Sequence, residues 1–385
     1  MHVGLSTGFA NHSQVDDVRF IKEELAQCVL ADELGFDSIW ITEHHFSDYS
    51  IAPNPLQYLT WLAGKTRHVR LGTQVVVVPW HDPVRLAEEI AVLDHVSDGR
   101  AIIGFGRGLA RMEYEGLRVD QSKARELFDE IVPMVMNAME TGYIEGGEIF
   151  KQPRREIRPR PVRSLKGRAF CAAGTPPSMA SAARLGLGRL YLGQPMVSGD
   201  RPRPFAPQTA ADTGKTAQDL TPEDSWMESW MQHRPNETPV APFVSNLVFI
   251  DESADKAAEL ARVYAVKTFR AAIKNYELTS SHHGNIKGYE SYKSIVMDEA
   301  GVEKAIEGVI ASSISGAPKD ILTQLDEVRR LREPQGMIPH VFTGGMPHED
   351  AVRSMHIFAR HCLNEMKSWP NAESTIDPPF LAAAE

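Results

Sequence analysis

Residues 36–46 combine a strand-like run with a cluster of side chains that can transfer protons. The run is rich in β-branched and aromatic residues, and Glu43, His44 and His45 follow it directly. Because side chains alternate along a strand, we expect His44 on the same face as Trp40, with Glu43 and His45 opposite. A histidine at a strand end can act as a general acid or base, so His44 is the first catalytic candidate. A hydrogen-bonded histidine without a chemical role is the alternative.

Two further segments predict an anion site. Gly-Phe-Gly-Arg-Gly at 104–108 ends a strand-like run, and Gly-Thr-Pro-Pro-Ser at 174–178 precedes a helix-like run. The first segment does not match the dinucleotide fingerprint, because Leu109 stands at the third glycine position. Arg107 can instead bind a phosphate through its guanidinium, and the second segment offers backbone N–H groups and hydroxyls to the same phosphate.

Alternating strand-like and helix-like runs predict the element that positions these residues. We expect strands in the first part of 36–46 and at 3–9, 69–78, 100–106, 169–173, 189–192, 243–250 and 337–343, with helices between them. Eight such units favour an α/β fold of the closed (β/α)8 TIM-barrel type, in which the strand ends carry the active site. A doubly wound parallel sheet is the alternative.

The whole chain, residues 1–385, is expected to form a single domain with insertions near 142–168, 194–242 and 275–296. The first is rich in Pro and Arg and is typical of a solvated connection. The third is polar and aromatic without a strong period, and its length predicts a lid over the site.

Composition narrows the class of protein. The formal net charge of −10 argues against nucleic-acid and membrane partners and favours a small-molecule ligand. No apolar run approaches the roughly 20 residues of a membrane span, so we expect a cytoplasmic protein. Cys28, Cys171 and Cys362 are widely spaced and predict buried thiols without a bridge. The histidines lack metal-ligand spacing, so we expect no metal.

A series of short motifs resembles the bacterial luciferase family of flavin-dependent monooxygenases. The resemblance covers essentially the entire chain and is strongest from 1 to 190. The motifs are Gly35-Phe36-Asp37, Glu43-His44-His45-Phe46, Asn54-Pro55, Gly72-Thr73, Pro83-Val84-Arg85 through Ala87-Glu88, Leu93-Asp94, Gly99-Arg100, Arg107-Gly108, Arg125 and, within the predicted lid, Lys287-Gly288-Tyr289.

The resemblance implies a barrel that binds reduced FMN, adds O2 to it, and uses the flavin hydroperoxide to oxygenate a small hydrophobic organic substrate. It implies that His44 is the catalytic acid or base. Glu43 and Glu88 fall on acidic positions of the family and are possible supporting residues. The cofactor-binding positions that it implies are Val75, Gly106, Arg107, Arg125, Thr175 and Ser178.

Departures from the family pattern bear on the chemistry. Gly106 stands where the light-emitting α subunit has a reactive cysteine, and Gln74-Val75 replaces a pair of small residues beneath the flavin. We therefore do not expect light emission. The chain lacks a convincing nicotinamide fingerprint, so NAD(P)H is expected to act only indirectly, through a separate flavin reductase. The resemblance also implies a homodimer formed by barrel helices.

Two other functions remain open. Related enzymes use the same barrel for hydride transfer with a deazaflavin and place a histidine similarly. Families with paired subunits also contain non-catalytic flavin-binding barrels.

Overall fold

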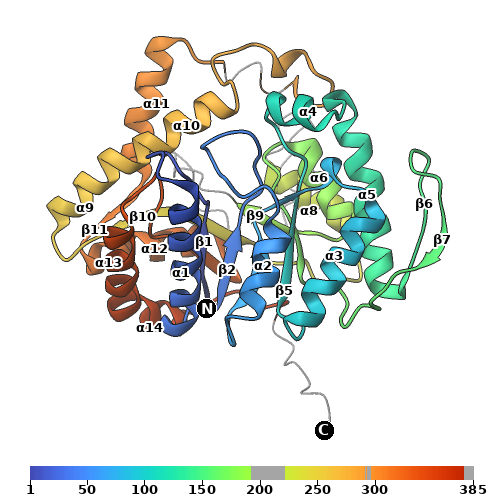
Figure 1. Cartoon of the computed structure of the whole chain (residues 1–385), viewed down its shortest axis with the longest axis horizontal. Helices are drawn as coiled ribbons and strands as arrows, with labels where there is room; N and C mark the ends of the chain where they lie inside the picture. Colours follow the sequence, from blue (N-terminus) through green and yellow to red (C-terminus); the bar gives the residue numbers. More distant parts are fainter. Residues whose placement is uncertain (192–221, 291, 293–295, 377–385) are drawn as a thin grey trace, which may run out of the picture.

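The computed structural model describes residues 1–191, 222–290, 292 and 296–376, and in it eight parallel strands close into a barrel (Figure 1). β1 pairs with β2 on one side and with β12 on the other, and the pairing of β9 with β10 closes the sheet. The doubly wound alternative is therefore wrong, and the predicted (β/α)8 barrel is confirmed. In barrel order the strands are β1 (His2–Thr7), β2 (Ser38–Ile41), β3 (Arg70–Thr73), β5 (Ala101–Gly106), β8 (Ala169–Cys171), β9 (Gly188–Tyr191), β10 (Phe243–Ile250) and β12 (Gly336–His340).

Helices surround the barrel, and local chemistry sets their ends. Asp16 accepts a hydrogen bond from the backbone of Arg19 at the start of α1, and Gly35 ends that helix at φ 87°. Asp82 caps α3 in the same way. The outer helices are α1 (Asp17–Leu34), α2 (Pro55–Ala63), α3 (Pro83–Val96), α5 (Ala124–Thr141), α6 (Pro176–Arg184), α9 (Ala254–Leu260), α10 (Val266–Asn275), α12 (Pro318–Arg332), α13 (His348–Phe358) and α14 (Asn364–Ser368).

Large side chains fill the interior of the barrel below the strand ends. Trp40 is fully buried and lies 5.1 Å, between ring centroids, from Phe243, which in turn contacts Phe170. Glycines make room for the indole: a Cβ on Gly72 would lie 2.5 Å from Trp40, and one on Gly4 would lie 2.9 Å from its Nε1. Trp40 thus faces the interior, as predicted. Because the interior is packed, a ligand has to bind at the strand ends.

Several elements differ from the sequence-based predictions. The single strand expected at 69–78 is interrupted after Thr73, and β4 (Val76–Val77) then pairs with β5 before a short helical turn, Val78–Trp80. The peptide bond between Gln74 and Val75 is cis. Elements that were not predicted are α4 (Arg111–Leu117), the hairpin β6 (Tyr143–Gly146) and β7 (Gln152–Glu156), α11 (Glu299–Ser312) and β11 (Ile314–Gly316).

The described parts of the predicted insertions lie outside the eight barrel strands. The hairpin β6–β7 occupies the first and projects from the side of the barrel (Figure 1). Of the second, residues 192–221 lie outside the described residues, and the part that follows begins with α8 (Pro222–His233). The third begins at the end of α10.

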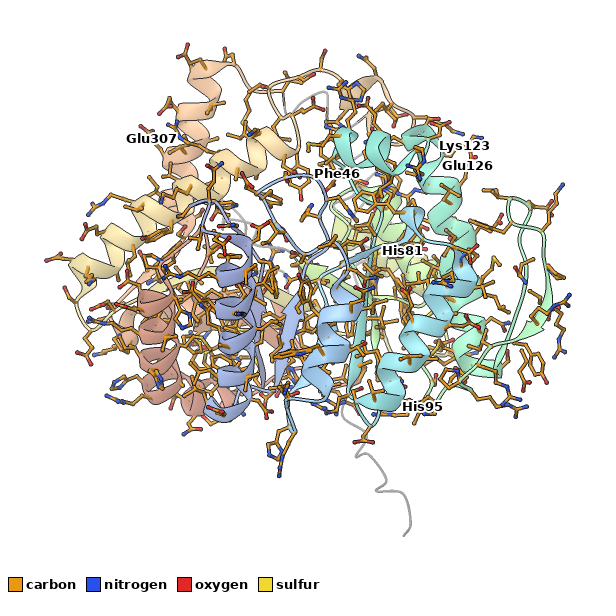
Figure 2. The ribbon with its side chains drawn as sticks, viewed as in Figure 1. Phe46, His81, His95, Lys123, Glu126 and Glu307 are labelled. Atoms are coloured by element: carbon orange, nitrogen blue, oxygen red, sulfur yellow. The ribbon has the colours of Figure 1, made fainter. Side chains whose placement is uncertain are left out.

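Loops and helices at the carboxyl ends of the strands form a cover. Figure 2 shows Phe46 and Glu126 towards this end and His95 at the opposite end. Lys287, in the third insertion, forms an ion pair of 2.7 Å with Glu126, and Glu277 forms one of 2.5 Å with Arg111 on α4. The third insertion is therefore tied to α4 and α5 across the mouth of the barrel.

Other sequence features can be located in the described residues. Cys28, Cys171 and Cys362 are free thiols and all three are buried. Among these residues, every helix is too short or too polar to cross a membrane. The same part of the chain holds no cluster of three or more His, Cys, Asp or Glu side chains suited to a metal ion.

Glu24 on α1 is a buried carboxyl that makes stability depend on pH. Burial raises its pKa to about 7 from an ordinary 4.5, although Thr7 donates a hydrogen bond to it. Because the folded-state pKa is raised, ionisation costs folding free energy as the pH rises through this window. We expect Glu24→Gln to raise the free energy of unfolding by about 3 kcal/mol at about pH 8 and hardly at all at about pH 4.

Urea unfolding at the two pH values measures this difference. Glu33→Gln, an exposed change on the same helix, is the matched control and should show no pH-dependent gain. An equal gain for Glu24→Gln at both pH values would contradict the prediction.

Candidate active site

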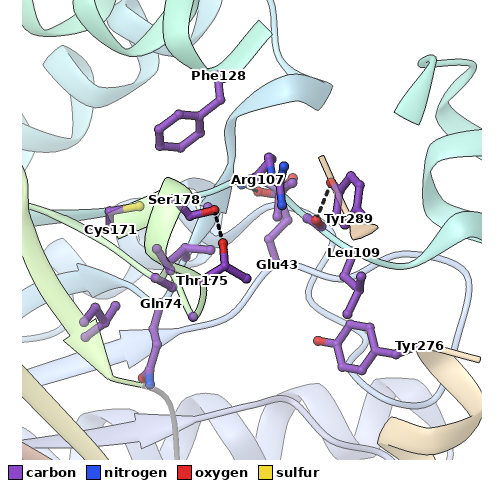
Figure 3. A pocket seen from close by; sticks show the side chains of 18 of the residues that line it. Glu43, Gln74, Arg107, Leu109, Phe128, Cys171, Thr175, Ser178, Tyr276 and Tyr289 are labelled. Atoms are coloured by element: carbon purple, nitrogen blue, oxygen red, sulfur yellow. Dashed lines mark hydrogen bonds between the residues drawn. The ribbon is translucent and has the colours of Figure 1, made fainter. Parts of the chain in front are cut away.

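A cavity opens at the carboxyl ends of β2, β5, β8 and β9, with the segment after α10 along one side (Figure 3). It brings together residues that lie far apart in the sequence. All seven residues predicted as catalytic or cofactor-binding line it: His44, Val75, Gly106, Arg107, Arg125, Thr175 and Ser178.

One end of the cavity is basic. Arg125 donates a hydrogen bond to Ser178, which also accepts one of 2.9 Å from Thr175 (Figure 3). Burial, together with the nearby charge of Arg107, lowers the pKa of Arg125. Among the described residues, Arg107 forms no ion pair with a carboxylate, and the nearest carboxylate oxygen to Arg125, on Asp129, is 3.9 Å away. Negative charge therefore balances the two guanidinium groups only weakly, and hydroxyls lie beside them at the start of α6. Such a site is suited to a phosphate.

Arg107 also contacts the third insertion. Its Nη1 donates a hydrogen bond of 2.8 Å to the carbonyl of Gly288, and its guanidinium lies 4.0 Å from the ring centroid of Tyr289. Tyr289 is fully buried and its hydroxyl donates to the carbonyl of Gly108. The basic end of the cavity is therefore packed directly against the predicted lid.

His44 lies at the other end, where both of its ring nitrogens have partners. Nδ1 is 2.9 Å from Oε1 of Glu113, which is buried on α4, and Nε2 is 3.2 Å from the hydroxyl of Tyr276. Neither partner was identified from the sequence. They are 69 and 232 residues away from His44, and no local motif links them to it.

Glu43 lies in the cavity wall and is hydrogen-bonded to β4. Its buried carboxylate accepts hydrogen bonds of 2.6 Å from the backbone of Val77 and of 2.9 Å from His81. Although burial opposes ionisation, His81 and the hydrogen bonds lower the pKa of Glu43. His45 also turns towards Glu43, at 3.4 Å. These contacts fit a supporting role, in which Glu43 fixes the position of the cavity wall.

Two details differ from expectation. Glu43 and His44 were predicted to face opposite ways, but both line the cavity because β2 ends at Ile41 and strand alternation stops there. Glu88 lies on α3 outside the residues that line the cavity, and among the described residues it has no hydrogen bond or ion pair to them. Its supporting role stays a prediction.

Val75 fills the space where a side chain at position 106 would project. A Cβ on Gly106 would lie 2.2 Å from Cγ2 of Val75, which is closer than any real contact. We expect Gly106→Ala to displace Val75 from the cavity wall, to destabilise the protein by about 1–3 kcal/mol and to weaken flavin binding. Adding Val75→Ala to this variant should restore most of the stability and most of the flavin affinity, because it removes the opposing methyl groups.

Thermal unfolding and titration with FMN measure these two effects. Gly308→Ala is the matched control, because a Cβ there meets no atom within 4 Å. If Gly106→Ala behaves like this control, the steric argument is wrong.

The family model of the luciferase-like monooxygenases matches residues 1–332. The chain belongs to this family. The oxygenase component of the flavin-dependent trigonelline monooxygenase of Acinetobacter baylyi is 37% identical over 158 residues, 40% of this chain and 44% of that protein. The alkanal monooxygenase alpha chain of Photorhabdus luminescens is 34% identical over 116 residues, 30% of this chain and 32% of that one. The chain thus matches less than half the length of either relative.

Solved structures share the fold of this luciferase-like chain. Monooxygenase RslO1 from Streptomyces bottropensis has a TM-score of 0.68 at 22% identity, over 95% of this chain and 100% of that one. The oxygenating constituent of 3,6-diketocamphane monooxygenase from Pseudomonas putida, a type II Baeyer–Villiger enzyme in complex with FMN, has a TM-score of 0.69 at 14% identity, over 97% and 99%. An F420-dependent secondary alcohol dehydrogenase has a TM-score of 0.64 at 14% identity, over 94% of this chain and 97% of that one. At these identities the likeness shows the fold alone.

Proposed function

We propose that this luciferase-like protein is the oxygenase component of a two-component monooxygenase, which uses reduced FMN and O2 to oxygenate a small hydrophobic organic substrate. One observation carries the proposal: a single cavity has paired guanidinium groups at one end and His44 at the other. The names of the relatives, a flavin-dependent monooxygenase and an alkanal monooxygenase, support the same class of reaction.

Arg107, Arg125, Thr175 and Ser178 would hold the phosphate of FMN, and Val75 and Gly106 would border its ring system. Reduced FMN supplies the electrons that activate O2, which the protein itself cannot do. A neighbour of the same fold was solved in complex with FMN, which supports this choice of flavin. The chain's own contribution is to bind the flavin, to exclude water and to transfer protons.

His44 would be the general acid or base of the reaction. Groups of this kind contribute roughly 10²- to 10⁴-fold to a rate. Glu113 would orient the imidazole, because it accepts a hydrogen bond from Nδ1.

Part of the cavity lining is apolar. Leu109, Phe128 and Leu190 line it together with tyrosines of the third insertion, which supports a hydrophobic substrate. The insertion would act as the lid that keeps water from the reacting oxygen.

Two protein partners complete the proposal. A separate NAD(P)H-dependent flavin reductase would supply reduced FMN, as the designation of one relative as an oxygenase component supports. A second copy of the chain would pack against α2 and α3, where Trp61, Val92 and Val96 are 44%, 39% and 49% exposed.

The experiment supplies FMNH2 enzymatically, screens hydrophobic compounds, and measures O2 consumption, oxygenated product and peroxide together. The proposed function predicts product formation that requires both FMNH2 and O2. The absence of FMN binding and of product across the screen would contradict it.

Hydride transfer with a deazaflavin is a second candidate, because an F420-dependent dehydrogenase has the same fold. Turnover with a reduced deazaflavin under anaerobic conditions would favour it over the monooxygenase. A non-catalytic flavin-binding subunit would bind FMN and show neither reaction.

A further inference from the structure

The imidazole of His44 has both nitrogens occupied by protein groups, which limits how it can reach a ligand. Oε1 of Glu113 is 2.9 Å from Nδ1 and also accepts a hydrogen bond of 2.8 Å from the backbone N–H of His45. This oxygen is therefore an acceptor, and Nδ1 carries the hydrogen that it receives. In the neutral imidazole Nε2 then carries the lone pair and accepts the hydrogen bond from the hydroxyl of Tyr276.

Tyr276 lies beside His44 in the wall of the cavity. It lines the cavity, and Figure 3 shows its hydroxyl directed inwards, on the opposite side from Thr175 and Ser178. Its ring lies 5.8 Å from the imidazole and 5.3 Å from the ring of Tyr49, in edge-to-face contacts that fix its orientation.

Contacts on either side of Tyr276 fix its backbone. Asn275 accepts a hydrogen bond of 2.7 Å from Ser47, and Glu277 pairs with Arg111. Arg111 belongs to α4, the helix that also carries Glu113. The hydroxyl of Tyr276 and the carboxylate that orients His44 are thus held by one local structure.

We propose that Tyr276 is a catalytic residue whose hydroxyl exchanges protons with the bound reactants, while His44 and Glu113 act behind it. This inference rests on the proposed function. When the Tyr276–His44 pair acts as a base, a reacting group loses a proton to the oxygen of Tyr276, and the phenol proton passes to Nε2 of His44. The resulting imidazolium is balanced by the Glu113 carboxylate, and the reverse transfers return the proton.

The ionisation of the tyrosine agrees with such a relay. Burial, with the nearby Tyr49 and Glu113, raises the pKa of Tyr276 well above its ordinary value. The phenol therefore stays neutral at neutral pH and keeps the proton that it has to pass on.

The first test needs no flavin. Tyr276→Phe keeps the ring and removes the hydroxyl, and Tyr49→Phe removes the adjacent hydroxyl as a matched comparison. With nitrogen-15-labelled histidine in the full-length protein, NMR should show the Nε2 signal of His44 shifted in Tyr276→Phe and nearly unchanged in Tyr49→Phe. An unshifted signal in Tyr276→Phe would overturn the proposal.

The second test uses FMNH2 and O2 without an organic substrate, and records peroxide release across a range of pH. Two electrons and two protons pass from FMNH2 to O2, which yields FMN and H2O2. Tyr276→Phe should bind FMN like wild type but should slow release by roughly 10²-fold and flatten its pH dependence. Tyr49→Phe should slow peroxide release much less.

A third variant separates a chemical role from a structural one. Difluorotyrosine introduced at position 276 keeps the hydroxyl but ionises at lower pH, so it should move the alkaline limb of the pH profile to lower pH. A wild-type profile in this variant, or in Tyr276→Phe, would overturn the proton-transfer role and leave the proposed function intact. A wild-type protein that oxidises no FMNH2 would overturn both.

Discussion

His44→Ala should bind FMN like the wild-type protein and lose most product formation, by roughly 10²- to 10⁴-fold. In the proposed relay the imidazole accepts the proton from Tyr276 and Glu113 orients it, so its removal should interrupt proton transfer. The basic end of the cavity is formed by other residues and stays intact. Turnover with enzymatically supplied FMNH2 and a separate FMN titration measure the two properties.

His45→Ala is the matched control for this variant. His45 is the neighbouring histidine, but its side chain turns to Glu43, away from Tyr276. We therefore expect a much smaller loss of product formation. Full activity in His44→Ala, or equal losses in the two variants, would contradict the assignment of His44.

Arg107→Ala should weaken FMN binding by roughly 10- to 100-fold, the effect of losing a hydrogen bond to a charged group of about 1.5–3 kcal/mol. Its guanidinium is half of the pair that creates the positive end of the cavity. The variant also loses the contacts with Gly288 and Tyr289, so the lid should become less protected from hydrogen exchange. FMN titration and thermal unfolding together distinguish weakened binding from a damaged fold.

Arg155→Ala removes an exposed arginine of the hairpin β6–β7 and is the matched control. It should leave FMN affinity unchanged. Binding by Arg107→Ala that equals this control would show that the phosphate lies elsewhere.

The tests of Tyr276 and His44 bear on one another. If the proton passes through the hydroxyl, both variants should lose the same limb of the pH profile while FMN affinity stays constant. If His44 contacted the reactants directly, Tyr276→Phe would keep that limb.

Much of the fold follows from short-range patterns in the chain. β10 was predicted at its observed bounds, Phe243–Ile250, because a buried parallel strand is a continuous run of apolar residues. The start of α3 is likewise local, because Pro83 opens the helix and the adjacent Asp82 caps it. The break after Thr73 was missed, because the valines that follow have the same β propensity in either geometry.

The chain by itself also determined which residues could be proposed for the site: His44 at a strand end, Arg107 after a glycine-rich strand, and Thr175 and Ser178 at a helix start, all of which line one cavity. Each is recognisable because its chemistry and its element are encoded within a few residues. Only the tertiary structure decided which groups meet. Glu113 and Tyr276 reach His44 from distant segments, and Val75 excludes a side chain at Gly106, because closing the barrel sets these distances and no local pattern does.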